Sequence, residues 1–232
     1  MSRFIPILLV TLCLPSWCLA ADDKADKEDK EAKVALKTEI PEEVLAGTPP
    51  DVLAKLFPKL LPPPTAKRPA FMVPKGTVNL AIEKKVTSSE ERPIVGELKF
   101  VTDGKKEGSD ETFVELSPQP QWVQIDLEKP SKIYAIFLWH YFREARGYRD
   151  VIIQVSDDPK FAKGVKTIYN NDQDNSSKKG IGKDRPYMES NLGKIIDAKG
   201  AKGRYVRLYS NGNTANNMNH YVEVEIFGKP AS

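Results

Sequence analysis

Two segments of the chain hold side chains suited to recognising a sugar. Their candidate binding residues are Trp139, His140, Tyr141, Arg143, Asn211, Asn219 and His220. Amide, imidazole and guanidinium groups hydrogen-bond hydroxyls, and an aromatic ring covers the C–H face of a sugar. The segments also hold the only two histidines of the chain. An alternative stays open: Trp139 and His140 could belong to the core, with His140 hydrogen-bonded to backbone.

Catalytic chemistry has no comparable basis in the sequence. The Gly-x-Ser-x-Gly and His-Glu-x-x-His motifs are absent, and Gly180-Ile181-Gly182 lacks the strand and lysine of a phosphate loop. The 32 acidic residues offer many carboxylate pairs, but no pattern selects one for glycoside hydrolysis. Two histidines and two cysteines are too few for zinc sites built from Cys/His clusters. We therefore expect no enzymatic activity and no catalytic residues.

The amino-terminal residues 1–20 have the pattern of a secretory signal peptide. Arg3 precedes an apolar run that is too short to span a bilayer, and Cys18-Leu19-Ala20 forms a small-residue cleavage site. We expect a secreted, periplasmic or cell-surface protein without a transmembrane segment. A lipid anchor on Cys18 is the weaker hypothesis, because Pro15-Ser16-Trp17 is a poor approach to such a cysteine.

Residues 21–75 are first charged and then rich in proline. Nine of the 18 prolines lie between Pro41 and Pro74. This composition predicts a disordered tether. Apolar residues at helical spacing predict one short helix at 51–61, with Asp51 as its cap. The tether is interpreted as a linker, and the alternative is a docking peptide for a partner.

The elements that must position the candidate binding residues are short strands. The expected strands are Val78–Ala81, Trp122–Leu127, Ile133–Phe142, Tyr148–Ser156, Lys166–Asn170, Arg204–Ser210 and Tyr221–Phe227. Val123, Ile125 and Leu127 alternate with polar residues, which is the period of a strand with one buried face. The pattern predicts an all-β protein with a β-sandwich domain over residues 76–230.

Charge limits the partners of this domain. The chain has 35 basic and 32 acidic residues, a formal net charge of +3. Charges this balanced are untypical of a nucleic-acid-binding surface. We expect a monomer that binds no nucleic acid.

Several segments, in this order, resemble the discoidin or coagulation-factor C-type domain. They are Asn79-Leu80-Ala81 to Val86-Thr87-Ser88-Ser89, Thr102-Asp103-Gly104, residues 121–127, Val155-Ser156-Asp157-Asp158, residues 204–208 and residues 223–228. The sequence is most similar to a bacterial exported subgroup related to carbohydrate-binding modules. The resemblance implies a galactose-binding-like jelly-roll sandwich, here preceded by the signal peptide and the tether. It also implies a non-catalytic module that holds a glycan or polysaccharide in loops at one end. The alternative is a protein or cell-envelope partner bound by the same loops.

The same resemblance implies a structural Ca²⁺. The matching positions are Asp103 and Glu223, with Asp110 and Thr112 as looser candidates. Ca²⁺ takes six to eight oxygen ligands, which two carboxylates and loop carbonyls can supply. In the alternative, Asp103 caps a turn, and Glu223 pairs with an arginine, either Arg204 or Arg207. The run 170–177 resembles a calcium loop only faintly, without the glycine and glutamate of an EF-hand. It is interpreted as a solvated hairpin loop.

Overall fold

The computed structural model describes Met1 and residues 31–43, 46–63, 68–109 and 112–231. The chain forms two compact units, Met1–Glu31 and Ala32–Ser232. The predicted signal peptide, with Cys18, lies outside the described residues, as does most of the charged stretch behind it. The elements described below belong to the second unit.

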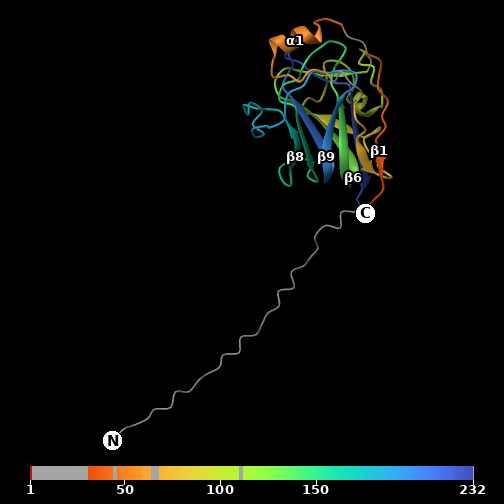
Figure 1. The fold of residues 1–232 in the computed structure, drawn as a ribbon, viewed down its shortest axis with the longest axis vertical. Coiled ribbons are helices and arrows are strands. Elements are labelled where there is room, and N and C mark those ends of the chain that lie inside the picture. The colour runs from red at the N-terminus through yellow and green to blue at the C-terminus, as the bar shows by residue number, and fades with distance from the viewer. Residues whose placement is uncertain (2–30, 44–45, 64–67, 110–111, 232) are drawn as a thin grey trace. The chain divides into compact units, whose positions relative to one another are not determined.

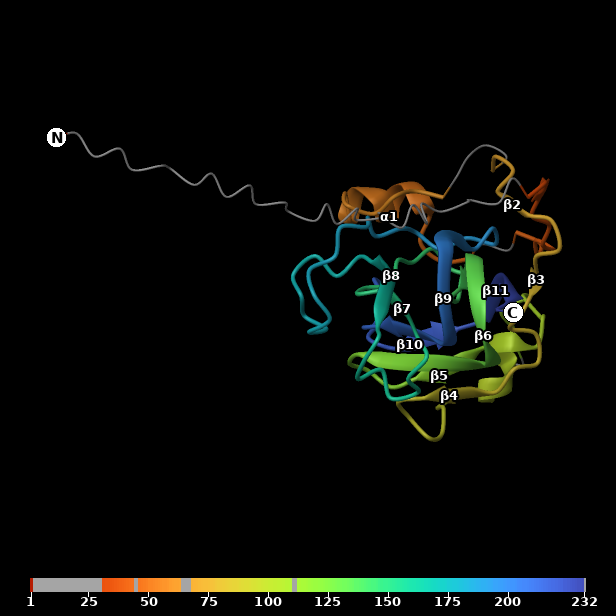
Figure 2. The same cartoon turned by 90° about the horizontal axis from the view of Figure 1, so that it is seen from below.

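The second unit is an antiparallel β-structure, as predicted. Its strands and helices, in chain order, are β1 (Lys33–Ala35), α1 (Pro50–Leu56), β2 (Met72–Pro74), β3 (Val78–Asn79), β4 (Val86–Ser88), the 3₁₀ helix η1 (Leu98–Thr102), β5 (Val114–Leu116), β6 (Gln121–Trp139), β7 (Ile152–Ser156), β8 (Lys166–Asn170), β9 (Lys194–Ser210), β10 (Asn219–Tyr221) and β11 (Glu223–Pro230). The main sheet has the order β3-β11-β6-β9-β7-β8, which can be followed from right to left in Figure 2, and β4 pairs with β6. Two further pairs are β1–β2 and β10–β5.

Two long strands, β6 and β9, bend and run through both layers of the sandwich. The β6–β9 register breaks between Asp126 and Ser131, where Glu128 has φ 66°. Before the bend β6 pairs with β4, and after it β6 pairs with β11. In β9 the turn falls at Lys199 and Gly200, both with positive φ. The sequence predicted β6 as two separate strands and did not predict the first half of β9.

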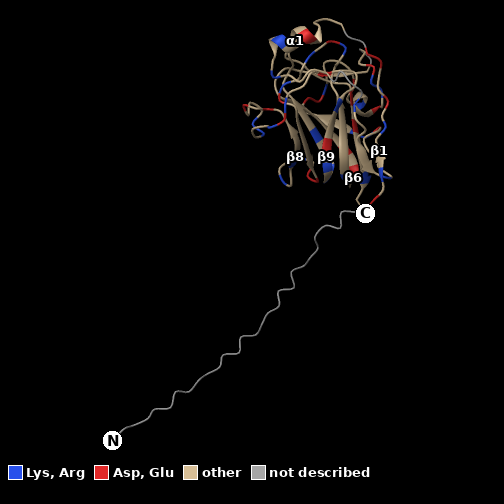
Figure 3. Ribbon diagram, viewed as in Figure 1, with Lys and Arg blue, Asp and Glu red and all other residues tan. Residues whose placement is uncertain are grey.

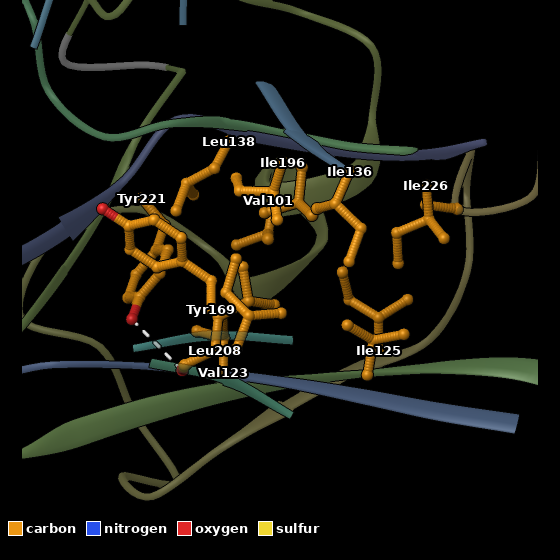
Figure 4. Close-up of a cluster of buried hydrophobic side chains, with 14 of the residues drawn as sticks. Val101, Val123, Ile125, Ile136, Leu138, Tyr169, Ile196, Leu208, Tyr221 and Ile226 are labelled. Atoms are coloured by element: carbon orange, nitrogen blue, oxygen red, sulfur yellow. Dashed lines mark hydrogen bonds between the residues drawn. The ribbon is translucent and has the colours of Figure 1, made fainter. Parts of the chain in front are cut away.

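The core lies between the two layers. Val123, Ile125 and Leu208 reach it from one layer, and Leu138 and Ile226 from the other (Figure 4). All five side chains are fully buried. The apolar side chains of the period-two alternation predicted for residues 122–127 therefore face the core, as expected.

Residues 32–43, 46–63 and 68–75, which we call the N-terminal cover, pack on the sandwich. The first and last of these stretches lie over the outer face of the layer formed by β11 and the second half of β6. Leu36 and Phe71 of the cover pack on Phe137 and Trp139 of β6. The strands β1 and β2 pair with each other at this side of the sandwich (Figure 1). The sequence predicted this segment as a tether. In the structure, its scattered apolar residues pack on a hydrophobic face of the sheet.

Helix α1 and the residues after it pack on loops of the sandwich. The helix begins at Pro50, one residue before the predicted start, and no side chain caps it. Leu53 and Leu60 are buried against Ala145 and Met188. Backbone hydrogen bonds, such as Leu61 N to Pro186 O at 2.9 Å, join the cover to the loop before β9. Within the described part of the chain, no helix has the length and apolarity to cross a membrane.

Candidate functional site

The two histidine-containing segments meet inside the domain. His140 follows β6, and His220 lies in β10. The His140 ring stacks on Tyr148 with centroids 4.2 Å apart, and Tyr148 Oη lies 2.8 Å from His220 Nδ1. His140 Nδ1 is 2.7 Å from Glu189 Oε1, and His220 Nε2 is 2.8 Å from Glu115 Oε2. Both rings are buried and contact the domain itself.

The surroundings of His220 favour its neutral form. Burial, together with the nearby charges of Arg146 and His140, lowers the pKa of His220 to about 3. A neutral ring that carries its proton on Nε2 donates to Glu115 and accepts from Tyr148, so both nitrogens are satisfied. This arrangement is that of a structural histidine.

Trp139 also lies in the interior. Its Nε1 donates to Asn191 O at 2.9 Å, and its ring stacks on Phe137. Its exposed fraction is 0%, because the N-terminal cover packs over this face of β6. The structure therefore favours the core alternative for Trp139 over the sugar platform.

Asn219 acts as a link between loops. Its Oδ1 accepts from Ser210 Oγ and Gly212 N, both at 2.8 Å. Its Nδ2 donates to Ser117 O and Gln119 O. Every hydrogen-bonding site of the amide is thus occupied within the domain, and none is left for a ligand.

Tyr141 and Arg143 are half-buried beyond the end of β6. Tyr141 packs edge-on against Phe113, and the Arg146 guanidinium lies 4.6 Å from its ring centroid. Arg143 Nη1 donates to Glu107 O at 3.4 Å. Both residues contact the loop that precedes β5 rather than Asn211.

Asn211 lines an open depression of about 300 Å³ between three loops, which we call the loop depression. Its lining residues are Pro118, Gln119, Pro120, Arg149, Asn211 and Asn217. Arg149 Nη2 donates to Asn217 Oδ1 at 2.8 Å, and Asn211 Nδ2 donates to Asp150 Oδ2 at 2.7 Å. The depression therefore offers one guanidinium and carboxamide groups at the surface.

Backbone strain occurs at one lining residue of the loop depression. Gln119 has φ 81°, a value that non-glycine residues adopt at a cost. Such strain is concentrated at functional sites. Sequence reasoning did not select Arg149 or Gln119, because their role depends on loops that meet only in the fold.

The predicted cation residues Asp103 and Glu223 are neighbours. Glu223 Oε2 accepts from Gly104 N at 3.1 Å, next to Asp103, whose own Oδ1 accepts from Lys105 N. Burial, with the charges of Glu225 and Asp103 nearby, raises the pKa of Glu223 to about 9. Glu223 Oε1 has no hydrogen-bond partner among the described residues. A buried carboxylate with an unpaired oxygen beside other carboxylates fits a cation.

Of the two looser candidates for the cation site, Thr112 has another role in the structure. Thr112 Oγ1 donates to Ser109 O and accepts from Ser109 N, so it closes a local turn. Asp110 lies outside the described residues. The alternative of Glu223 paired with an arginine does not occur: Arg204 binds Asp126, and Arg207 binds Gln124.

The loop at residues 170–177 brings three carboxylates together. Oxygens of Asp150, Asp172 and Asp174 all lie within 4.8 Å of one another. Asp172 accepts from the backbone N–H groups of Ser176 and Ser177, and Asp150 accepts from Ser176 Oγ. These hydrogen bonds stabilise the loop in the absence of an ion.

Comparison with known family models gives one match. The model of a NedA-like, galactose-binding domain of the F5/F8 type C group matches residues 100–208. No curated protein matches the chain.

Solved structures similar to the chain include several carbohydrate-binding proteins. One is the family 32 module of AlyQ in complex with 4,5-unsaturated mannuronic acid, with 19% identity, a TM-score of 0.45, and coverage of 62% of this chain and 93% of that one. A fucose-binding module of Streptococcus pneumoniae has 20% identity and a TM-score of 0.44, over 64% of this chain and 96% of that one. A family 89 glycoside hydrolase from Clostridium perfringens has 16% identity and a TM-score of 0.49, and the match covers 66% of this chain and 15% of the enzyme. Likeness at this distance does not indicate a ligand.

The family model and the observed antiparallel sheets indicate the same kind of fold. Residues 100–208 of this chain match the model of an F5/F8 type C, galactose-binding-like domain, and they lie within the β-structure described above.

Proposed function

We propose that this protein is an exported, non-catalytic module that binds carbohydrate in the loop depression. The observation that carries the proposal is the set of Arg149, Asn211 and Asn217 around an open space of about 300 Å³. Guanidinium and carboxamide groups supply the donors and acceptors that sugar hydroxyls need. The galactose-binding-like family of residues 100–208 supports the same class of ligand.

Ring stacking has less support than hydrogen bonding in this site. The lining residues include prolines at positions 118 and 120 but no aromatic residue. Pyrrolidine rings supply apolar area for the C–H face of a sugar without an aromatic platform. We therefore expect weak, hydrogen-bond-dominated binding, which is sensitive to loss of a single polar group.

We further propose that Asp103 and Glu223 hold a structural Ca²⁺. The support is the unpaired, buried Oε1 of Glu223 and its raised pKa. A divalent cation would supply the positive charge that the buried carboxylate lacks, and it would tie the loop after η1 to the start of β11. Its contribution would be to stability, because neither ligand lines the loop depression.

The test is binding of the purified protein to an array of bacterial and plant glycans, with Ca²⁺ and with chelator. We expect Arg149→Gln and Asn217→Ala to weaken binding roughly tenfold or more while the melting temperature is unchanged. Arg185→Gln is the matched control, since Arg185 is exposed and does not line the depression.

Two outcomes would refute the carbohydrate proposal. In one, no glycan binds, and a pull-down returns a single stoichiometric protein, which would favour the alternative of an envelope or protein partner. In the other, glycans bind equally to the wild type and to both depression variants.

A further inference from the structure

Lys106 carries an ammonium group that is buried among carboxylates. Basic and acidic residues are interspersed along the ribbon of the domain (Figure 3), and most of their side chains are exposed. Lys106 is only 6% exposed, whereas its neighbours Lys105 and Glu107 face solvent. A buried ammonium is tolerated when its charge is paired and its protons are hydrogen-bonded. The partners of Lys106 therefore show what this cation does.

These partners belong to two segments that are distant in the sequence. Lys106 Nζ lies 2.7 Å from Glu225 Oε1 of β11. It also donates to Thr38 Oγ1 at 2.9 Å and to Glu39 O at 3.1 Å, both in the N-terminal cover. Thr38 Oγ1 in turn donates to the other Glu225 oxygen at 2.6 Å. We call these four residues the cover latch, because they fasten the cover to the sheet.

The cover latch adjoins the aromatic cluster beneath the cover. Lys106 Nζ lies 4.9 Å from the Trp139 ring centroid, close enough for a cation–π contact. Leu36, two residues before Thr38, packs on the same cluster as Trp139. The latch is therefore part of what keeps this cluster away from water.

The latch shares its surroundings with the proposed cation site. Glu223 and Glu225 are two residues apart in β11, so both side chains leave the strand on the same face. Burial raises the pKa of Glu223; the charges of Glu225 and Asp103 raise it further, and the ammonium of Lys106 lowers it. Lys106 is thus close enough to act on the carboxylate that is proposed to hold the ion.

An ammonium beside a cation site opposes the binding of a second cation. Like charges repel, and the repulsion is strong where burial excludes water. Lys106 cannot move aside freely, because leaving Glu225 would also break the rest of the latch. A divalent cation on Asp103 and Glu223 and a closed latch therefore disfavour each other. Linkage makes the effect reciprocal, so the latch weakens ion binding by the same factor by which the ion weakens the latch.

We propose that Lys106 makes Ca²⁺ binding and attachment of the N-terminal cover antagonistic, so that the ion loosens the cover at the latch and exposes the cluster around Trp139. The inference rests on the Ca²⁺ proposed at Asp103 and Glu223 and adds a regulation of that site. It is independent of the loop depression, whose lining includes no latch residue.

The first experiment is calorimetric titration of the purified protein with Ca²⁺ at pH 7. Lys106→Met removes the ammonium and keeps an apolar stem against Trp139, and we expect it to bind Ca²⁺ roughly tenfold tighter or more than the wild type. Thr38→Val keeps Lys106 but removes the hydroxyl that joins the latch, so it should also bind tighter, and it replaces Lys106→Met if that variant does not fold. Lys105→Met and Thr48→Val, at exposed positions of the same segments, are the controls and should bind as the wild type.

Limited proteolysis reports on the latch itself. Lys37 is exposed and directly precedes the latch, so a lysine-specific protease that needs no Ca²⁺ detects loosening as a faster cut after Lys37. We expect Ca²⁺ to speed this cut in the wild type and to leave unchanged the cut after Lys59, an exposed residue in another stretch of the cover. In Lys106→Met the cut after Lys37 should be fast with and without Ca²⁺, since the latch is already broken.

The antagonism is overturned if Lys106→Met and Thr38→Val bind Ca²⁺ no more tightly than the wild type, or if Ca²⁺ slows the cut after Lys37. Equal affinities of all the variants would leave the proposed ion site standing and refute only the role of Lys106. If the wild type and every variant fail to bind Ca²⁺, the proposed ion site itself is refuted, and the antagonism with it.

Discussion

Replacing Glu223 by glutamine should expose the link between stability, pH and Ca²⁺. In the ion-free protein the pKa of Glu223 is about 9, against 4.5 for a free glutamate. A carboxyl whose pKa is raised on folding contributes full stability below pH 4.5, and that stability is lost as pH rises toward 9. The free energy of unfolding should then fall by about 1.4 kcal/mol per pH unit, or about 3 kcal/mol by pH 7. Glutamine resembles the protonated acid and does not titrate, so Glu223→Gln should lack this loss.

Urea unfolding in chelator between pH 6.5 and 8.5 measures this difference. The window avoids His220, whose lowered pKa of about 3 affects stability below pH 6.5 and in the opposite direction. Subtracting the Glu223→Gln values from the wild-type values cancels the other titrating groups. We expect the difference to change by about 1.4 kcal/mol per unit in chelator and to flatten in saturating Ca²⁺, because a bound ion keeps Glu223 ionised.

Glu91→Gln, at an exposed position, should behave as the wild type. The reasoning is refuted if the wild-type and Glu223→Gln curves stay parallel in chelator across this window. The proposed Ca²⁺ site is refuted if Ca²⁺ raises the urea midpoint of the wild type and of Glu223→Gln equally.

Three further predictions concern the buried parts of the domain. Since the pKa of His220 is lowered to about 3, the native state should lose stability as pH falls from 6.5 toward 3, by about 1.4 kcal/mol per unit; NMR should show no titration of His220 above pH 5, and a midpoint near 6.5 would contradict this. Gly193→Ala should cost about 2–4 kcal/mol in urea unfolding, because the new Cβ at φ 62° would collide with the Trp139 indole. Gly164→Ala is the control, because Gly164 has φ 61° but a Cβ there would meet no atom within 4 Å. An equal loss of stability in both variants would show that the contact with the indole does not contribute. Leu60→Ala should cost about 2–4 kcal/mol and speed proteolysis within residues 46–63, whereas Leu56→Ala, at a side chain 66% exposed, should do neither; equal proteolysis of both variants would show that this segment is not held by its buried leucine.

Local pattern was enough to predict the sandwich. The alternation around Val123 and Ile125 requires one buried face, and the structure buries both residues completely. The ordered segments that resemble the discoidin domain predicted the family that matches residues 100–208. The resemblance also implies that Asp103 and Glu223 share a cation site, which stays a prediction; in the structure Gly104 N donates to Glu223 Oε2.

Other features depended on contacts between distant segments. Glu225 is buried because Thr38 of the N-terminal cover and Lys106 of a distant loop bind its carboxylate. The polar cluster around His140 likewise requires Glu189, 49 residues away.

The sequence by itself determined the strand pattern, the fold class and the charge balance, because these depend on the order of neighbouring residues. The tertiary structure decided which polar residues face solvent. A side chain such as Trp139 has the same local sequence whether its outer face is bare or covered. Residues distant in sequence, among them Leu36, Phe71 and Lys106, pack on this cluster and remove it from water.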